Sequence, residues 1–369
     1  MLKRKVLLFS VFLSIFYCLS LKVSGKNIPE DNIKHPSSST EEGKRFNPTE
    51  FLFEHISDAH EWHVFSYKGK PYSIPLPVII ISRNNGLVLF LSNKLHHGNT
   101  SSFVRGYEYR LELEGENKGK IAEIHEGSVL GFPIDISITK NILAMFVSVV
   151  IILWLFISIA GAYKRKPGKP PRGIQSLFEP IILFVRDEIA KQSIGHNYEK
   201  FVPYLLTVFF FIWFNNMLGL IPIPPGGANL TGNIAVTGVL ALFTMMIVNF
   251  SGNKNYWKHI FNTPGVPIWL KIPPLMPLIE LFGVITKPVV LMIRLFANIT
   301  AGHLITLGFL SLIFVFGELN ASVGFMVSPL SIIFLLFMMF LELLVAFIQA
   351  FVFTFLSALY IGMAVEEHH

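Results

Sequence analysis

The sequence predicts a mainly α-helical membrane protein with five membrane helices, a long, steeply tilted C-terminal helical hairpin, and a small β-rich N-terminal domain outside the membrane. The composition indicates the membrane, because 52% of the 369 residues are hydrophobic and only 15% are charged. Several apolar stretches exceed the roughly 18 residues typical of a spanning helix. The net charge of +6 does not indicate nucleic-acid binding, because the excess Lys and Arg lies between apolar segments and forms no basic stripe.

The chain begins with the three parts of a secretory signal peptide. A basic start is followed by the apolar run from Val6 to Leu21 and by small residues around Ser24, so we expect residues 1–25 to be a signal peptide. An uncleaved extra helix is the alternative. The only cysteine, Cys18, lies inside this segment, so the mature chain would have no thiol for disulfides or metal binding.

A soluble region follows the signal peptide. Residues 26–47 are polar and are expected to form a disordered linker, and residues 48–139 are expected to form the β-rich domain. Val78 to Ser82 and Leu87 to Ser92 flank an Asn85-Gly86 pair, which is a strong signal for a β-hairpin. If the signal peptide is present, this domain lies outside the cytoplasm.

One cluster in this domain suggests a metal site. His55, Asp58, His60 and His63 fall within nine residues, and imidazole and carboxylate groups are zinc ligands. The spacing matches no known metal-binding template, so a structured lead-in to the first strand is the competing interpretation. No cofactor is expected elsewhere in the chain.

Five apolar segments are long enough to span the membrane: residues 141–163, 201–221, 234–250, 277–316 and 329–365. Basic residues are concentrated after the first and third of these, whereas the connections 222–233 and 317–328 contain no Lys or Arg. The positive-inside rule therefore predicts a cytoplasmic C-terminus and an N-terminal domain on the opposite side. Residues 174–191 are apolar at helical spacing and predict an amphipathic helix on the cytoplasmic surface, or one docked on another subunit.

The last two segments are too long to stand upright in a bilayer. About 37 residues of helix measure roughly 55 Å against about 30 Å of hydrocarbon, so steep tilt is expected. If they form an antiparallel hairpin, the position numbers of facing residues have a constant sum. Arg294 with Gln349 and His303 with Glu342 give nearly the same sum, so both pairs predict the same hairpin centre.

Arg294 is the most unusual of these residues. A permanent cation in an apolar helix costs about 3 kcal/mol or more and indicates a water-filled cavity or a carboxylate partner. His303 and Glu342 can exchange protons, which predicts a proton path beside a fixed positive charge. Packing roles are the alternatives for His303 and Gln349.

Three motifs carry a resemblance to a known family. They are the segments Leu291–His303, Leu341–Phe353 and Asn216–Pro222, and they resemble subunit a of the F-type ATP synthase, the stator half of its proton channel. The resemblance covers roughly residue 133 to the C-terminus. The signal peptide and the β-rich domain are not part of the minimal family pattern.

The resemblance implies a role for each polar residue of the hairpin. Arg294 would face the rotating c-subunit ring and interact with its carboxylates, and Gln349 would lie beside it. Asn298, His303 and Glu342 would belong to the half-channel open to the outer side. Some bacterial relatives carry the Glu and the His in exchanged positions.

The resemblance also implies partners and a location. Glu280 would lie near the cytoplasmic half-channel, although a carboxylate at a helix start is the competing interpretation. The partners would be the c-subunit ring, the b-subunit stalk, the remainder of the synthase and the lipid bilayer, and the location would be the bacterial inner membrane. No nucleic-acid partner is expected.

Two other functions compete with this interpretation. A self-contained secondary transporter would be expected to contain internal repeats, and none is evident. A structural scaffold of a respiratory complex would not need a charge at Arg294. The chain has no phosphate-binding Gly-x-x-x-x-Gly-Lys-Ser/Thr loop, so we expect a non-catalytic subunit that leaves ATP chemistry to other chains.

Overall fold

The computed structural model divides into two compact units. One contains Met1–Phe146, Ile221–Ala228 and Leu310–Ser331, and the other contains Val147–Leu220, Asn229–Phe309 and Ile332–His369. The structure describes residues 47–366 except for 50–51, 53–55, 68–69, 96–100, 113–116, 118, 166–167, 169, 222–225 and 262–274. The predicted signal peptide and nearly all of the predicted linker lie outside the described residues.

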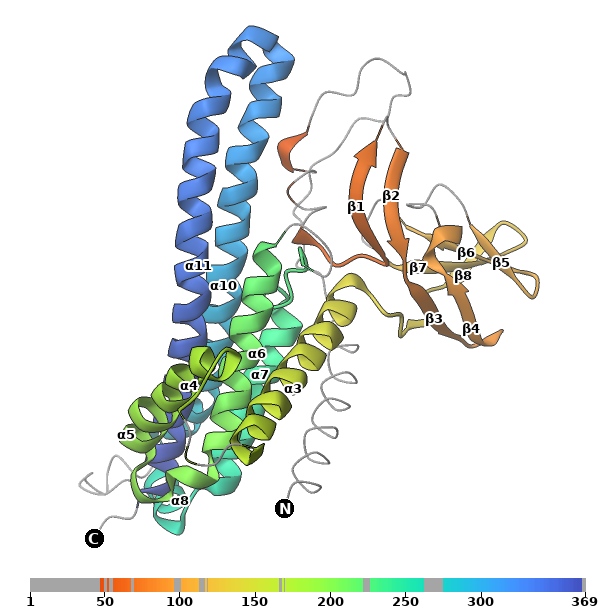
Figure 1. Cartoon of the computed structure of the whole chain (residues 1–369). Helices are drawn as coiled ribbons and strands as arrows, with labels where there is room; N and C mark the ends of the chain where they lie inside the picture. Colours follow the sequence, from red (N-terminus) through yellow and green to blue (C-terminus); the bar gives the residue numbers. More distant parts are fainter. Residues whose placement is uncertain are drawn as a thin grey trace. The chain divides into compact units, whose positions relative to one another are not determined.

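Within the described part of the chain, five helices are long and apolar enough to cross a membrane. They are α3 (Lys140–Arg165), α6 (Val202–Leu220), α7 (Ile234–Ser251), α10 (Leu275–Leu319) and α11 (Ala321–Val365) (Figure 1). Each coincides with a predicted span, which confirms the predicted fold class. The 45 residues of α10 and of α11 correspond to roughly 68 Å of helix each.

The predicted connection of the long hairpin was wrong in length. Residues 317–328 were expected to form it, yet only Asn320 separates α10 from α11. The Asn320 side chain accepts a hydrogen bond from the Ser322 amide at 3.0 Å, which satisfies a free donor at the start of α11. Gly317 and Gly324 approach so closely that a Cβ on Gly324 would lie 2.7 Å from the Gly317 Cα. The glycines therefore allow both helices to continue to the turn.

The region 174–191 is helical as predicted, but its second half is wound more loosely. Helix α4 (Ile174–Phe184) continues into the π-helical segment η3 (Val185–Lys191), α5 (Gln192–Ile194), and the 3₁₀ segment η4 (Gly195–Lys200). The Phe178 ring of α4 stacks on Phe214 of α6, with centroids 6.1 Å apart. A Cβ on Gly362 of α11 would lie 2.0 Å from the Ser193 carbonyl oxygen. This segment therefore packs directly against helices of its own chain.

Three small antiparallel sheets make up the described β-rich region. A hairpin joins β1 (Glu61–Tyr67) to β2 (Lys70–Pro75), a three-stranded sheet has the order β4-β3-β9, and a four-stranded sheet has the order β5-β6-β7-β8. The remaining strands are β3 (Pro77–Ser82), β4 (Gly86–Leu91), β5 (Ser102–Val104), β6 (Tyr107–Leu111), β7 (Ile121–His125), β8 (Ser128–Gly131) and β9 (Ile134–Asp135). Ser82 pairs with Gly86 across the β3–β4 turn, which confirms the predicted hairpin.

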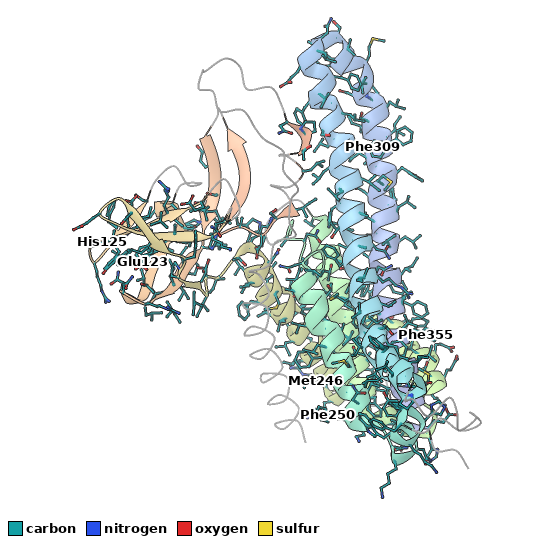
Figure 2. The ribbon with its side chains drawn as sticks, turned by 180° about the vertical axis from the view of Figure 1, so that it is seen from behind. Glu123, His125, Met246, Phe250, Phe309 and Phe355 are labelled. Carbon is teal, nitrogen blue, oxygen red and sulfur yellow. The ribbon has the colours of Figure 1, made fainter. Side chains whose placement is uncertain are left out.

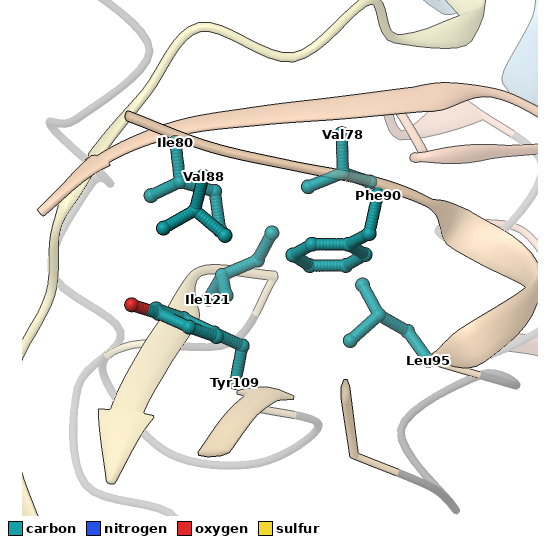
Figure 3. Packing of buried hydrophobic residues seen from close by; sticks show 7 residues of the cluster. All are labelled: Val78, Ile80, Val88, Phe90, Leu95, Tyr109 and Ile121. Carbon is teal, nitrogen blue, oxygen red and sulfur yellow. The ribbon is translucent and has the colours of Figure 1, made fainter. Parts of the chain in front are cut away.

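The core of this region lies between the two larger sheets. Figure 3 shows seven of its side chains converging from both sheets and the adjoining turn: Val78, Ile80, Val88, Phe90, Leu95, Tyr109 and Ile121. The buried carboxylate of Glu123, labelled in Figure 2, accepts hydrogen bonds from the Ser82 hydroxyl at 2.6 Å and the Tyr109 hydroxyl at 3.1 Å. These bonds satisfy a buried polar group that would otherwise be costly.

Polar contacts join the β-rich region to the first turn of α3. The Lys140 amide donates to the Ala59 carbonyl at 2.9 Å, and the Asn141 amide donates to the Asp58 carboxylate at 3.1 Å. Nearby, the His60 Nε2 lies 2.7 Å from the Asp135 carboxylate. The start of α3 is therefore held by backbone and side-chain bonds as well as by the covalent chain.

This joint is expected to weaken in alkaline solution. Burial lowers the pKa of His60, but the hydrogen bond to Asp135 and the negative charges of Asp135, Asp58 and Glu61 together outweigh burial, so the pKa is raised overall. Burial raises the pKa of Asp135, but the hydrogen bonds from His60 and Ser137 and the positive charge of His60 together outweigh burial, so the pKa is lowered. The contribution of His60 to folding stability is fully present below about pH 6.5 and is lost as the pH rises through the raised pKa of the folded state. The contribution of Asp135 is present above about pH 4 and is lost as the pH falls through its lowered folded-state pKa.

Hydrogen exchange of the assembled protein can test this expectation. The Lys140 and Asn141 amides should lose about 1 kcal/mol of protection, after correction for intrinsic rates, between pH 6 and pH 9. The amides of the β3–β4 ladder, which contain no such ion pair, serve as the internal control. Equal changes in both places would show that the His60–Asp135 pair does not hold the joint.

Candidate functional site

The closest pair of ionisable groups on the long hairpin is His303 and Glu342. The His303 Nδ1 of α10 lies 3.7 Å from a carboxylate oxygen of Glu342 on α11, and their side chains are 17% and 10% exposed. The Phe309 and Phe334 rings stack in nearly the same register, with centroids 5.3 Å apart, and Figure 2 labels Phe309 on this hairpin. The predicted pairing of His303 with Glu342 is therefore confirmed as a contact.

Gly302 creates the space that the Glu342 carboxylate occupies. A Cβ at Gly302 would lie 2.6 Å from the Glu342 Oε1 and 3.0 Å from its Cγ, which is closer than van der Waals contact allows. Gly302 was not predicted from the sequence, because a glycine has no polar side chain to indicate a role. Its position directly before His303 is the feature that could have drawn attention to it.

Arg294 and Asn298 lie one turn apart on an exposed face of α10. Among the described residues, no carboxylate forms an ion pair with Arg294. Ala297 and Ala301 continue this exposed face with small side chains, which allow close approach of another helix. The antiparallel register that pairs His303 with Glu342 also places Arg294 opposite Gln349 and its neighbours on α11. The Gln349 side chain is buried.

A small pocket lies against α10, further from His303 along the helix than Arg294 is. Its lining includes polar side chains of α7, α8 (Lys254–Phe261), α10 and α11: Thr244, Asn249, Tyr256, Lys287 and Tyr360. The Lys287 ammonium lies 5.5 Å from the centre of the Tyr360 ring. Lys287 was missed in the sequence, although a second cation seven positions before Arg294 is a signal of the same kind.

Glu280 is an electrostatic neighbour of this pocket. Burial raises the pKa of Tyr256, and the negative charge of Glu280 raises it further. Tyr360, which also lines the pocket, lies within reach of the Arg294 charge. The Glu280 and Arg294 charges therefore each act on a tyrosine of the pocket lining, a connection that the sequence alone did not indicate.

Buried polar groups also connect α6, α7 and α11. The Thr231 hydroxyl donates to the Asn216 side-chain oxygen at 2.5 Å, and the Asn216 amide donates to the Ala346 carbonyl at 3.4 Å. The Tyr204 and Thr244 hydroxyls are 2.8 Å apart. Such bonds satisfy polar groups in an apolar setting and fix the helices against one another.

Two of the four suggested metal ligands have described side chains, Asp58 and His60. His55 and the side chain of His63 lie outside the described residues. The described part of the chain contains no group of three His, Cys, Asp or Glu residues that could hold a metal ion. The His60 ring is instead engaged with Asp135.

A model of one protein family matches residues 142–362, from the start of α3 almost to the end of α11. That model describes the ATP synthase A chain. The chain belongs to this family. Residues 51–135 match a second model, described as a domain of unknown function (DUF8433), which covers most of the β-rich region.

Curated relatives agree with this membership. A protein named ATP synthase subunit a from Chloroherpeton thalassium is 39% identical over 74% of this chain and 77% of its own length. ATP synthase subunit a 2 from Chlorobaculum tepidum is 44% identical over 64% of this chain and 65% of its own length. ATP synthase subunit a from Myxococcus xanthus is 42% identical over 64% and 75%, respectively. With five candidate spans, this member of the ATP synthase A chain family is a multi-pass membrane protein.

Proposed function

We propose that the chain is the proton-translocating stator subunit of a rotary F-type ATP synthase. It would provide two aqueous half-channels and the arginine that faces the c-ring carboxylates, while the nucleotide chemistry takes place on other chains. The observation that carries the proposal is the 3.7 Å pair of His303 and Glu342 between two apolar helices. An imidazole and a carboxylate at this separation can pass a proton with little movement.

His303 and Glu342 would form the half-channel that opens to the outer side of the membrane. A proton arriving at the imidazole is transferred toward the carboxylate and then along the hairpin. Asn298 lies between His303 and Arg294 in the chain, and its amide can bond water or an arriving carboxylate. Gly302 supports this path, because it lets Glu342 lie against the backbone of α10.

Arg294 would interact with the carboxylate of each passing c subunit. Its charge lies on an exposed face beside small side chains, so a helix of another subunit can come close. A guanidinium in an apolar surface is stabilised by a carboxylate brought to it. Because it stays protonated, it also blocks direct proton transfer between the two half-channels, with Gln349 beside it on α11.

The pocket beside Glu280 would form the cytoplasmic half-channel. Five of its lining side chains carry polar groups, and the Glu280 charge acts on one of them, Tyr256. The basic connections between spans favour the cytoplasm on this side, with the C-terminus there and the β-rich domain outside the bacterial inner membrane. The b-subunit stalk would hold the chain against the rotation of the ring.

A double-mutant cycle tests the proton pair. His303→Ala and Glu342→Ala should each lower ATP-driven proton pumping in membrane vesicles by about 10²-fold. The double variant should be no worse than the poorer single variant, because both groups serve one transfer. The exchange variant, His303→Glu with Glu342→His, should recover part of the activity because both groups are retained.

Phe309→Leu with Phe334→Leu is the matched control. These residues lie in contact on the same two helices but carry no exchangeable proton, so pumping per assembled complex should remain near the unmodified level. Multiplicative losses for His303 and Glu342, together with no recovery in the exchange variant, would contradict a shared proton transfer.

A further inference from the structure

One face of the β4-β3-β9 sheet is apolar and exposed. Its most exposed side chains are Ile81, Leu87, Leu89, Leu91 and Ile134, at 41%, 57%, 59%, 47% and 65%. The register makes them one patch, because Ile81 pairs with both Leu87 and Ile134, while Ile79 pairs with Leu89. The opposite face of the same sheet forms the core shown in Figure 3. This sheet is therefore apolar on both sides.

An exposed face of this kind requires a cover. Strand β4 is also the edge of its sheet, and a long apolar edge strand in water promotes aggregation. Contiguous exposed apolar patches mark sites of contact with proteins or membranes. The outward positions of β3 and β4 contain no charged side chain.

The sheet is fixed close to a membrane surface by its own chain. The segment that follows β9 still forms hydrogen bonds with β3. The Ile136 amide donates to the Ile79 carbonyl, and the Ile138 amide donates to the Pro77 carbonyl. Helix α3 begins at Lys140, only two residues later. Six residues of extended chain reach at most about 20 Å, so Ile134 is held within that distance of the start of a spanning helix.

Cations lie at both ends of β4. Arg83 occupies the β3–β4 turn and Lys94 follows the strand in the short helix η1 (Ser92–Lys94), and both side chains are exposed. Basic residues beside an apolar surface are complementary to a lipid, which presents phosphate above hydrocarbon. A protein partner would instead be expected to find polar groups for direct hydrogen bonds within the interface, and this face offers none from its outward side chains.

We propose that the apolar face of the β4-β3-β9 sheet lies in the headgroup and upper acyl region of the membrane that α3 crosses. The occupant is the lipid of that leaflet, with the aliphatic side chains in the acyl boundary and Arg83 beside the phosphates. The β-rich region then rests on the membrane and fixes the entry of α3. This assigns a lipid-binding surface to the segment that matches the domain of unknown function.

Depth-dependent fluorescence quenching tests the proposal in the assembled complex. In a Cys18→Ser background, Leu89→Cys is labelled with an environment-sensitive fluorophore and reconstituted in phosphatidylcholine and phosphatidylglycerol vesicles. Leu89 points away from the core, so its replacement leaves the packing intact. Arg110→Cys is the control, because Arg110 lies on the four-stranded sheet with its side chain 45% exposed.

Quenching by a lipid spin-labelled on its acyl chain should be several-fold stronger at Leu89→Cys than at Arg110→Cys. Iodide, present on both sides of the membrane, should quench the two sites in the reverse order. If iodide quenches both equally, the face lies in water and the proposal is wrong. If neither agent reaches Leu89→Cys, protein covers the face, whether residues 1–46 or another subunit, and the lipid assignment is equally overturned.

Discussion

Replacing Arg294 with alanine is expected to lower ATP-driven proton pumping by about a hundredfold or more, while ATP hydrolysis by the complex continues. The guanidinium is the charge on the exposed face of α10 to which a ring carboxylate would bind. Without it, the carboxylate has no fixed partner between the half-channels, and protons can cross without turning the ring. Inverted vesicles report pumping by quenching of an acridine dye, and hydrolysis is measured in the same preparation.

Lys287→Gln is the matched control for this variant. Lys287 is the other cation in the membrane part of α10, and it lies over the Tyr360 ring at the pocket. Because Lys287 lines the proposed cytoplasmic half-channel, its removal should lower pumping but leave it measurable, since the proposal requires the charge at Arg294 in particular. Normal pumping by Arg294→Ala in a complex that contains all its subunits would exclude a direct role for this charge.

The register of the long hairpin could be predicted because polar residues are rare within its apolar sequence. A proton-exchanging pair is easily recognised in such a sequence. The constant sum of facing position numbers predicted that His303 lies opposite Glu342, and the two side chains lie 3.7 Å apart. The stack of Phe309 on Phe334 is equally informative about register. The stack could not be predicted, because the chain has 35 phenylalanines and nothing in the sequence indicates which of them pair.

The tight turn of the hairpin escaped prediction for a different reason. Residues 317–328 were expected to form the connection because they separate the two long apolar segments. The structure uses Gly317 for close helix contact, and Asn320 caps the following helix. Glycine and asparagine occur both in loops and where two helices pack closely. Only the position of the partner helix shows which of the two structures forms.

The β-rich region shows the same limit at longer range. The β3–β4 hairpin depends on a local Asn-Gly turn and was predicted, whereas the β3–β9 pairing joins Ile80 to Asp135. The bond between His60 and Asp135 also spans 75 positions. Contacts of this kind depend on the path of the whole domain, so composition and spacing did not reveal the joint to α3.

Gly302→Val is expected to lower proton pumping by nearly as much as Glu342→Ala, about 10²-fold, while the complex still assembles. A Cβ at this position would lie 2.6 Å from the Glu342 Oε1. The side chain of Glu342 can rotate away, so the helices can remain packed, but its carboxylate then leaves the position beside His303. The expected defect is therefore in proton transfer, measured as pumping per assembled complex.

Gly308→Val separates this effect from the general cost of valine in place of glycine. Both glycines lie in α10, but a Cβ at Gly308 would meet no atom within 4 Å, so this variant should stay within about twofold of the unmodified protein. A second change then distinguishes the cause. If Gly302→Val acts by displacing the carboxylate, adding Glu342→Ala should cause little further loss, because the displaced group no longer contributes. A full additional loss on adding Glu342→Ala would mean that the carboxylate still works in the presence of valine, and that Gly302 serves only the packing of the hairpin.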